Sequence, residues 1–406
     1  LVARILAPDD VAIYFLVTSL VPMLAFAGSF GLHLAVVRFV AEALGLEQEG
    51  RVRAVVSKVL LLALASGAAL FLLLWGGGLN FINSLFYQSE QLGQTALVVA
   101  CWSFLWVLQL IYAEIFRGFN DIRLAVTFRR LGPNAVVLII LLAFYLGWPE
   151  VGLLAVLWSG AAGWAVCLLI SAWIALGKIS PLGHEGDAGF REVVNTSWPL
   201  GVTSTLTFAI TQVDIWIIGA LAVISDLALY GAAAKLTRFI IFPLFILNAT
   251  LPPLISSLYA RREFGELEYL LRRCSTWASL FGLVSLGAVM LFGGEILGVI
   301  YGDFYAAGSG FLQILVVGLL FRMAGGASQM ALMMTGQEKL TMTVSLITAV
   351  ILVFGGCLFG SLGGAMAVAW VVVVAQVFQN LCYVFYVKKR IRISPWPSLK
   401  SLVQKA

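Results

Sequence analysis

Long apolar runs constrain the fold of this chain more than any other feature of its sequence. Most stretches between charged residues are about 18 to 30 residues long, the length a helix needs to cross roughly 30 Å of hydrocarbon. Of the 406 residues, 61% are hydrophobic and 11% are charged, whereas soluble domains carry about 25% charged residues. The alternating segments of about ten residues that are typical of membrane barrels are absent. The sequence therefore predicts an all-α polytopic membrane protein.

The apolar runs predict eleven complete membrane helices and one stub. Their ranges are 1–6, 11–36, 54–75, 92–115, 124–147, 150–177, 194–222, 227–251, 276–300, 307–335, 340–359 and 361–387. An internal repeat with an offset of 216 residues maps the span 194–222 onto a helix that ends at residue 6, so we expect about 12 membrane helices, with helix 1 largely missing from this sequence.

An internal repeat relates the two halves of the chain. One block recurs 216 positions later in the pairs Asp10/Asp226, Ala12/Ala228, Tyr14/Tyr230, Leu20/Leu236, Phe26/Phe242 and Glu47/Glu263. Two further blocks follow in the same order, Tyr87 and Gly118 with Tyr305 and Gly336, and 152–158 with 364–370. Three ordered blocks indicate duplication of a six-helix unit. An even number of helices keeps both copies in one orientation, so we expect two parallel six-helix repeats.

The basic residues predict the orientation of the helices. All but four of the 25 Lys and Arg residues lie in or beside the loops that follow even-numbered helices, or in the C-terminal tail. These loops face the cytoplasm by the positive-inside rule, so both termini are expected there. We predict an N-terminal lobe at 1–177, a cytoplasmic linker at 178–193, a C-terminal lobe at 194–387 and a basic cytoplasmic tail at 388–406. The net charge of +5 comes from membrane-flanking loops and does not indicate nucleic-acid binding.

One basic cytoplasmic segment, 259–275, has two interpretations. Leu267, Leu270, Leu271 and Cys274 form an apolar stripe beside four arginines, which suits a helix lying on the membrane surface beside anionic lipid. The alternative is an ordinary basic loop that follows the positive-inside rule.

Signals of catalysis or cofactor binding are nearly absent from the sequence. No GxxxxGK[ST] motif occurs, so the sequence does not predict ATP hydrolysis, and neither HExxH nor a nucleophile elbow is present. The five cysteines lie in or beside apolar runs without metal-ligand spacing, which predicts neither disulfides nor a metal site. We therefore expect a transporter without a cofactor rather than an enzyme.

Charged residues within the apolar runs are the candidate functional residues. A cation at mid-bilayer costs about 2.5–3.5 kcal/mol on insertion scales, so such residues generally face a cavity or a partner. Asp214 lies in the span 194–222, and Lys235 and Arg238 lie three apart in the next span. These three residues are predicted at similar depth, either as a structural ion pair with one cation left over or as a binding site. Arg322 lies nearer the cytoplasm.

Several segments resemble bacterial polysaccharide-repeat flippases. They are Arg4-Ile-Leu-Ala-Pro-Asp-Asp, the run from Gly31 to Glu42, Asp214-Ile-Trp-Ile-Ile-Gly, Leu229-Tyr-Gly-Ala-Ala-Ala-Lys-Leu and Gly336-Gln-Glu-Lys. Such flippases form the polysaccharide transporter branch of the multidrug/oligosaccharidyl-lipid/polysaccharide (MOP) exporter superfamily. The resemblance covers nearly the whole chain and implies two six-helix lobes around a central cavity, as in multidrug and toxin extrusion (MATE) transporters.

The resemblance also implies a function in O-antigen-type surface polysaccharide or lipopolysaccharide biosynthesis. In such families a lipid-linked oligosaccharide crosses the bacterial cytoplasmic membrane, and cavity cations hold its diphosphate. Lys235, Arg238, Asp214 and Arg322 are the candidate substrate-binding residues here, with membrane lipids and polysaccharide assembly proteins as further partners. One alternative is an ion-coupled multidrug antiporter in which Asp214 carries a proton or sodium ion. Another is a membrane glycosyltransferase or polymerase, which the short loops disfavour.

Overall fold

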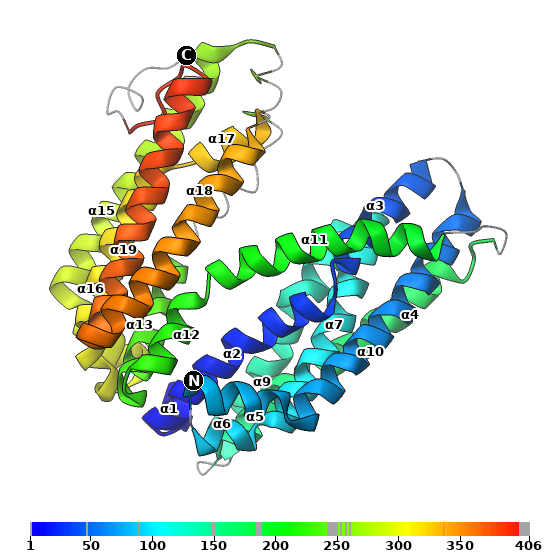
Figure 1. Cartoon of the computed structure of the whole chain (residues 1–406), viewed down its shortest axis with the longest axis horizontal. Helices are drawn as coiled ribbons and strands as arrows, with labels where there is room; N and C mark the ends of the chain where they lie inside the picture. Colours follow the sequence, from blue (N-terminus) through cyan, green and yellow to red (C-terminus); the bar gives the residue numbers. More distant parts are fainter. Residues whose placement is uncertain are drawn as a thin grey trace. The chain divides into compact units, whose positions relative to one another are not determined.

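The computed structural model describes residues 2–45, 48–87, 89–147, 151–183, 189–241, 251, 254–255, 258–259, 261–335 and 337–397. Nearly all of these residues are helical, and none of them forms a β-strand (Figure 1). By length and composition, eight helices among them can cross a membrane, or nine if the broken pair 190–210 and 213–221 counts as one span. The predicted all-α polytopic membrane fold is therefore confirmed.

The chain divides into two compact units, Leu1–Gln212 and Val213–Ala406. In unit 1, the helices are α1 (Val2–Ile5), α2 (Pro8–Gly28), α3 (Leu32–Gly45), α4 (Glu49–Leu73), α5 (Leu79–Ile82), α6 (Glu90–Gln94), α7 (Ala96–Gly118), α8 (Ile122–Val126), α9 (Gly132–Gly147), α10 (Leu153–Ile179) and α11 (Phe190–Ile210). Three π-helical turns join some of them, η1 (Leu74–Gly78), η2 (Asn83–Tyr87) and η3 (Thr127–Leu131).

Unit 2 contains the remaining helices. They are α12 (Val213–Leu221), α13 (Ile224–Ile240), α15 (Phe264–Tyr301), α16 (Ser309–Gly325), α17 (Ser328–Met334), α18 (Glu338–Val350) and α19 (Gly356–Arg390), with the 3₁₀ turn η4 (Asp303–Gly308) and the π turn η5 (Ile351–Gly355). By its contacts α11 packs on α2 and α3 in unit 1. The predicted lobe boundary at 178–193 rests on the repeat and stays a prediction. Residues 184–188 of that linker and 398–406 of the tail lie outside the described residues.

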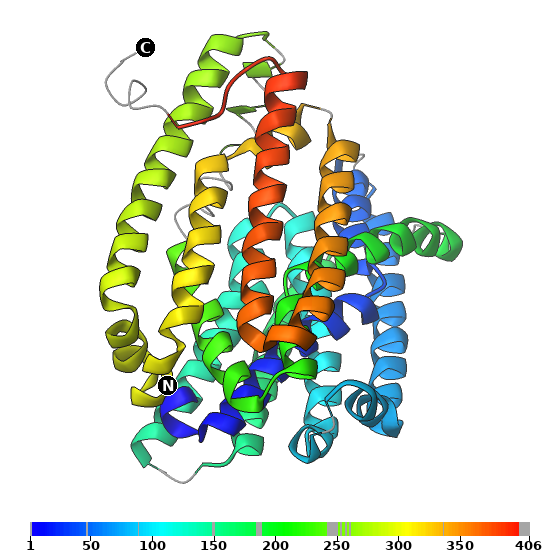
Figure 2. The same ribbon diagram turned by 60° about the vertical axis from the view of Figure 1, so that its left-hand side comes forward.

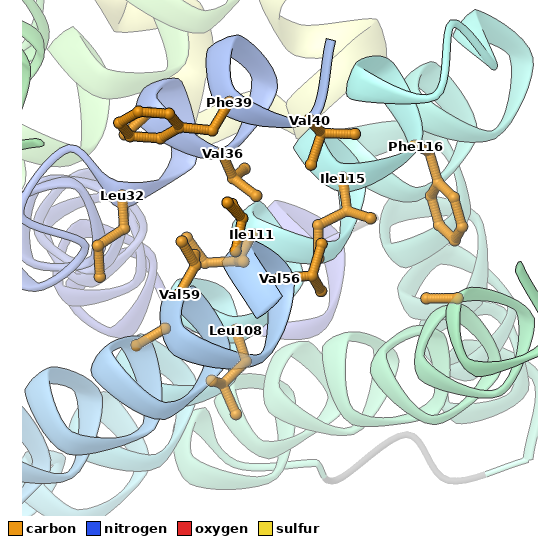
Figure 3. Packing of buried hydrophobic residues seen from close by; sticks show 14 of the residues in the cluster. Leu32, Val36, Phe39, Val40, Val56, Val59, Leu108, Ile111, Ile115 and Phe116 are labelled. Atoms are coloured by element: carbon orange, nitrogen blue, oxygen red, sulfur yellow. The ribbon is translucent and has the colours of Figure 1, made fainter. Parts of the chain in front are cut away.

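The core of unit 1 is built from α3, α4, α7 and their neighbours. Figure 3 shows Val36 and Val40 of α3 beside Val56 and Val59 of α4, with Ile111 and Ile115 of α7 completing the cluster. Close approach of the helices depends on small residues. An added Cβ at Gly118 would lie 2.8 Å from the Cβ of Val40, so α7 and α3 meet only because position 118 lacks a side chain.

The predicted span 11–36 is broken in the structure at residues 29–31, between α2 and α3. Phe30 and Gly31 have positive φ angles of 45° and 76°. At this kink α11 crosses in direct backbone contact, because a Cβ on Gly201 would lie 2.5 Å from the carbonyl carbon of Phe30 and 2.7 Å from the nitrogen of Gly31. Glycine at both positions is therefore a packing requirement of the crossing.

The predicted repeat block 152–158/364–370 marks equivalent helix starts. Gly152 is the N-cap residue of α10. Gly364, with φ of 62° and ψ of −156°, interrupts the continuous helical range of α19 three residues inside the predicted span 361–387. Each glycine therefore stands directly before a membrane-spanning segment. Three other repeated positions, Glu47, Phe242 and Gly336, lie outside the described residues.

Both interpretations of segment 259–275 are wrong for residues 264–275. These residues form the start of α15, a helix of 38 residues that packs beside α16, which in turn packs against α19 (Figure 2). At 1.5 Å per residue α15 is about 57 Å long, well beyond the roughly 30 Å of hydrocarbon. Leu267, Leu271 and Cys274 are buried in one hydrophobic cluster with residues of α17 and α19, among them Ala331 and Val387. The apolar stripe therefore faces protein, which explains its pattern without a membrane surface.

The contact between α11 and the α2–α3 kink gives a stability prediction. Gly201→Ala should destabilise the protein by about 1–3 kcal/mol, the usual cost of overpacking, because its methyl group overlaps the backbone of Phe30 and Gly31. Thermal unfolding of the purified protein in detergent measures the effect. Gly177→Ala in α10 is the matched control, since no atom lies within 4 Å of its added Cβ. Equal melting temperatures for the two variants would contradict the assigned crossing.

Candidate functional site

The buried acid of the predicted site lies directly after a helix break. The predicted span 194–222 is interrupted at Thr211–Gln212, and Asp214 is in the first turn of α12. A carboxylate near a helix N-terminus interacts favourably with the helix dipole. The Oδ2 atom of half-buried Asp214 accepts a hydrogen bond of 2.6 Å from the hydroxyl of Tyr230 on α13. Tyr230 is fully buried, so this bond joins α12 to α13 inside unit 2.

The two predicted cations lie further along α13. Lys235 is half-buried and Arg238 is exposed. Counted from Ile224 at 1.5 Å per residue, they lie about 16 and 21 Å along the helix. Arg238 is close enough for its charge to act on Asp214, Tyr230 and Lys235. We call Asp214, Lys235 and Arg238, on the consecutive helices α12 and α13, the charged cluster of unit 2; that they form one binding site stays a prediction. The structure adds Tyr230 as the hydrogen-bond partner of the acid.

Arg322, the fourth predicted residue, lies on α16 and is exposed. The helices α13 and α16 run in the same direction, because Tyr230 meets Phe311 at a ring-centroid distance of 5.8 Å and Ile241 packs with Leu319 and Met323. In this register Arg322 lies about one turn, 5–6 Å, beyond the level of Arg238. Its charge acts on Tyr383 of α19, whose hydroxyl lies 2.9 Å from the hydroxyl of Ser345 on α18. That Arg322 lies nearer the cytoplasm than Arg238 stays a prediction.

A second charged cluster lies in unit 1. Glu114 on α7, whose side chain is 1% exposed, forms ion pairs with Arg129 of η3 and, at 3.2 Å, with Arg117. A helix side chain three residues away is an ordinary partner, but Arg129 comes from a separate segment. Gln109 lies five residues before Glu114 on α7. Its side chain donates to the carbonyl of Phe128 at 2.8 Å and accepts from the hydroxyl of Ser171 of α10 at 3.2 Å. These contacts tie η3 to α7.

An ion pair also lies at the end of unit 1 that carries its basic loops. We call this end the basic end of unit 1. The Lys178 ammonium at the end of α10 donates to Oδ2 of Asp121 at 2.9 Å, and the other carboxylate oxygen accepts from the backbone N–H of Leu124. The bond from Lys178, followed by that from Leu124, lowers the pKa of Asp121 below its usual value. Asp121 therefore stays ionised at neutral pH as the N-cap of α8.

Sequence reasoning missed two residues that organise these clusters. Tyr230 stood out only as the repeat partner of Tyr14, and nothing in the apolar pattern shows that its hydroxyl meets Asp214. Glu114 and Arg117, three residues apart, have the spacing of an ordinary helix pair, which gives no sign of a further partner. The second partner of Glu114, Arg129, lies 15 residues further along the chain, a spacing that does not place two side chains on one helix face. The two meet because the chain turns back between α7 and η3.

The sequence of this chain matches a known protein family. Residues 1–259 match the family model described as "Polysaccharide biosynthesis protein". The chain belongs to this family. The match covers more than half of the chain and includes Asp214, Lys235 and Arg238, so the predicted recognition is confirmed. A second family model, MatE, matches residues 199–358, and no curated protein matches the chain.

Solved structures share the fold of this family member. An inward-facing multidrug resistance MATE family transporter of the MOP superfamily superposes with a TM-score of 0.81 at 16% identity, over 100% of this chain and 94% of that one. An outward-facing structure described in the same terms gives 0.65 at 17% identity, over 95% and 88%. A MOP superfamily transporter from Pyrococcus furiosus gives 0.61 at 16% identity, over 94% and 88%. The fold is that of a membrane transporter.

The ion pair between Glu114 and Arg129 gives a second stability prediction. Glu114→Gln should cost about 1–3 kcal/mol, because it removes the enclosed charge partner of two arginines that are themselves partly exposed. Glu268→Gln is the matched control, because its pair with Arg272 is partly exposed and worth at most about 1 kcal/mol. Thermal unfolding in detergent compares the two, and a smaller loss for Glu114→Gln would overturn the assigned role.

Proposed function

We propose that this protein flips a lipid-diphosphate-linked oligosaccharide, the repeat unit of a surface polysaccharide, across the bacterial cytoplasmic membrane. The match of residues 1–259 to polysaccharide biosynthesis proteins supports this cargo. The transporter fold supports movement of cargo rather than its chemical conversion. The basic loops support an orientation with both termini in the cytoplasm, so that the cargo moves from the cytoplasmic to the outer leaflet.

The cations of α13 carry the proposal. Lys235 and Arg238 lie three residues apart on α13, whose own acid, Asp226, is in its first turn. Asp214 on the preceding helix accepts a hydrogen bond from Tyr230. Charged hydrogen bonds to phosphate oxygens are about twice as strong as neutral ones, so two adjacent cations suit a diphosphate. Arg238 is exposed and so accessible to a ligand, and Arg322 extends the positive charge by one turn along α16.

The polarity of this cluster also discriminates between classes of cargo. A positively charged site attracts the anionic diphosphate and repels cationic drugs. The solved Pyrococcus furiosus relative is described in the words "Reverse polarity of binding pocket suggests different function of a MOP superfamily transporter". By analogy, the charge of the binding residues is the feature that assigns a cargo within this fold.

In the proposed mechanism the two lobes alternate access to the binding residues. The diphosphate binds Lys235 and Arg238, with Arg322 nearer the cytoplasm as a contact during entry. The hydrophilic sugars need a polar environment, because each unpaired hydroxyl in hydrocarbon costs several kcal/mol. The lipid tail stays in the bilayer, where it loses no hydrophobic stabilisation.

Charge removal on α13 tests the proposal. Lys235→Gln combined with Arg238→Gln should reduce surface glycan by at least tenfold in cells that depend on this protein, because both phosphate contacts are lost. Glycan is measured by gel staining or lectin binding, with membrane expression as a reference. The control is Lys389→Gln, which removes a cation of the same kind at the end of α19. Normal glycan export by the double variant would refute the binding role.

The second candidate is an ion-coupled multidrug antiporter. The match of the MatE model to residues 199–358, a range that contains all four predicted site residues, favours it. Asp214 would then carry the coupling ion, and Tyr230 would have to release its hydrogen bond whenever the ion binds.

Cationic dyes separate the two candidates. Under our proposal, expression in a drug-sensitive host leaves the minimal inhibitory concentration of ethidium unchanged, and Asp214→Asn does not alter that value. Ion-coupled export instead predicts at least fourfold resistance for the wild-type chain and its loss in Asp214→Asn. Resistance of this kind without any glycan defect would establish the antiporter.

A further inference from the structure

A groove in unit 1 lies where α11 crosses the α2–α3 kink. It has a volume of about 190 Å³ and is lined by Phe30, Leu32, Leu62, Ala65, Ser66, Val194, Ser197 and Trp198. We call it the kink groove. Phe30 and Trp198 are 54% and 59% exposed, so the two aromatic rings form an open rim. The left-handed backbone of Phe30 turns this side chain out of the regular path of the helix.

The walls of the kink groove are apolar although two serines line it. The hydroxyl of Ser66 donates to the carbonyl of Ala63 at 3.3 Å, and that of Ser197 donates to the carbonyl of Val193 at 2.7 Å. Both hydroxyls are therefore bonded within their own helices. A groove of this size is smaller than the roughly 300–1,000 Å³ of a drug-sized ligand pocket, so it suits a stretch of a single hydrocarbon chain.

Cations flank the kink groove toward the basic end of unit 1. On α4, Lys58 lies four and eight residues before Leu62 and Ser66, and it therefore shares their helix face. On α11, Arg191 lies three and seven residues before Val194 and Trp198, again on the lining face. The pair between Arg51 and Glu192, at 3.6 Å, holds the same two helices together at this end. Two cations thus adjoin an apolar groove.

We propose that the kink groove binds one acyl chain of an anionic phospholipid, with the lipid phosphate at Lys58 and Arg191. The order of apolar groove and then cations matches the order of chain and then phosphate in such a lipid. The positive-inside pattern assigns the cationic end to the cytoplasmic leaflet, where anionic lipids are attracted by Lys and Arg near the surface. This site is separate from the cluster of unit 2 and does not depend on the cargo proposed above.

Retention of lipid by the purified full-length protein tests this site. The probes are phosphatidylglycerol and phosphatidylcholine with identical chains, and native mass spectrometry measures the retained lipid. The wild-type protein should prefer phosphatidylglycerol, and Lys58→Gln with Arg191→Gln should reduce that preference on the order of tenfold. Lys58→Arg with Arg191→Lys should restore it, because the charge is kept. Ala65→Leu should lower retention of both lipids alike, because the added side chain fills the groove.

Two control variants make the same kinds of substitution at positions outside the kink groove. Arg123→Gln removes an exposed cation at the start of α8, and Ala162→Leu adds the same bulk at an exposed position of α10. Neither should change lipid retention. Equal loss of preference in Arg123→Gln, or an unchanged preference in the double Gln variant, overturns the proposal. Displacement of phosphatidylglycerol by an equimolar polyisoprenyl phosphate also overturns it, because the groove would then belong to the carrier of the cargo.

Discussion

Satisfaction of backbone hydrogen bonds inside the bilayer is the constraint on which this structure depends. Hydrocarbon offers no partner to an exposed N–H or carbonyl group, so membrane-spanning segments are helical unless something replaces the lost bonds. The breaks observed here carry such replacements. At the α2–α3 kink, Ser29 donates to the carbonyl of Phe26 at 2.8 Å, and at the end of α11, Thr211 donates to the carbonyl of Phe208 at 2.7 Å. A hydroxyl residue thus accompanies both interruptions.

The same constraint applies to buried charge, and the two units meet it in different ways. In unit 1 the enclosed carboxylate of Glu114 is neutralised by arginines, which fixes the position of η3. In unit 2 the carboxylate of Asp214 accepts from a tyrosine hydroxyl, and Lys235 and Arg238 lie on the following helix. In the first arrangement both arginines pair with the acid. In the second, the acid bonds to an uncharged hydroxyl and Arg238 is exposed, which is why unit 2 is the stronger candidate for an anionic ligand.

Much of this architecture could be predicted from the apolar pattern, because burial in lipid is imposed residue by residue along the chain. The predicted spans coincide with helices at 92–115, 150–177 and 276–300. The breaks at residues 29–31 and 211–212 could not be predicted in this way, because both fall within uninterrupted apolar runs and depend on partners elsewhere. In the sequence, Gly31 looks like any other small residue of an apolar run. Only the structure shows that Gly201 packs directly against it. The helix extension from Phe264 was missed because its apolar stripe fits either lipid or protein.

Within the candidate site, sequence could identify the charged residues but not their bonds. A charge in an apolar run is visible at once, and Asp214, Lys235, Arg238 and Arg322 were all found this way. The choice between Tyr230 and a cation as the partner of Asp214 depends on helix rotation and on the break before α12. Neither the helix rotation nor the break before α12 can be derived from the spacing of residues in the sequence.

The length of α15 has a mechanical consequence. Between Phe264 and the irregular residue Phe292, where φ is −124° and ψ is 15°, the helix forms an uninterrupted rod about 42 Å long. A rod of that length pivoting by ten degrees about Phe292 displaces its free end by about 7 Å. Arg272 near that end donates to the carbonyl of Ser394, so the segment after α19 is fastened to the rod. A small tilt within the bilayer is therefore amplified at the basic end of unit 2, where a probe attached near residue 264 would report it.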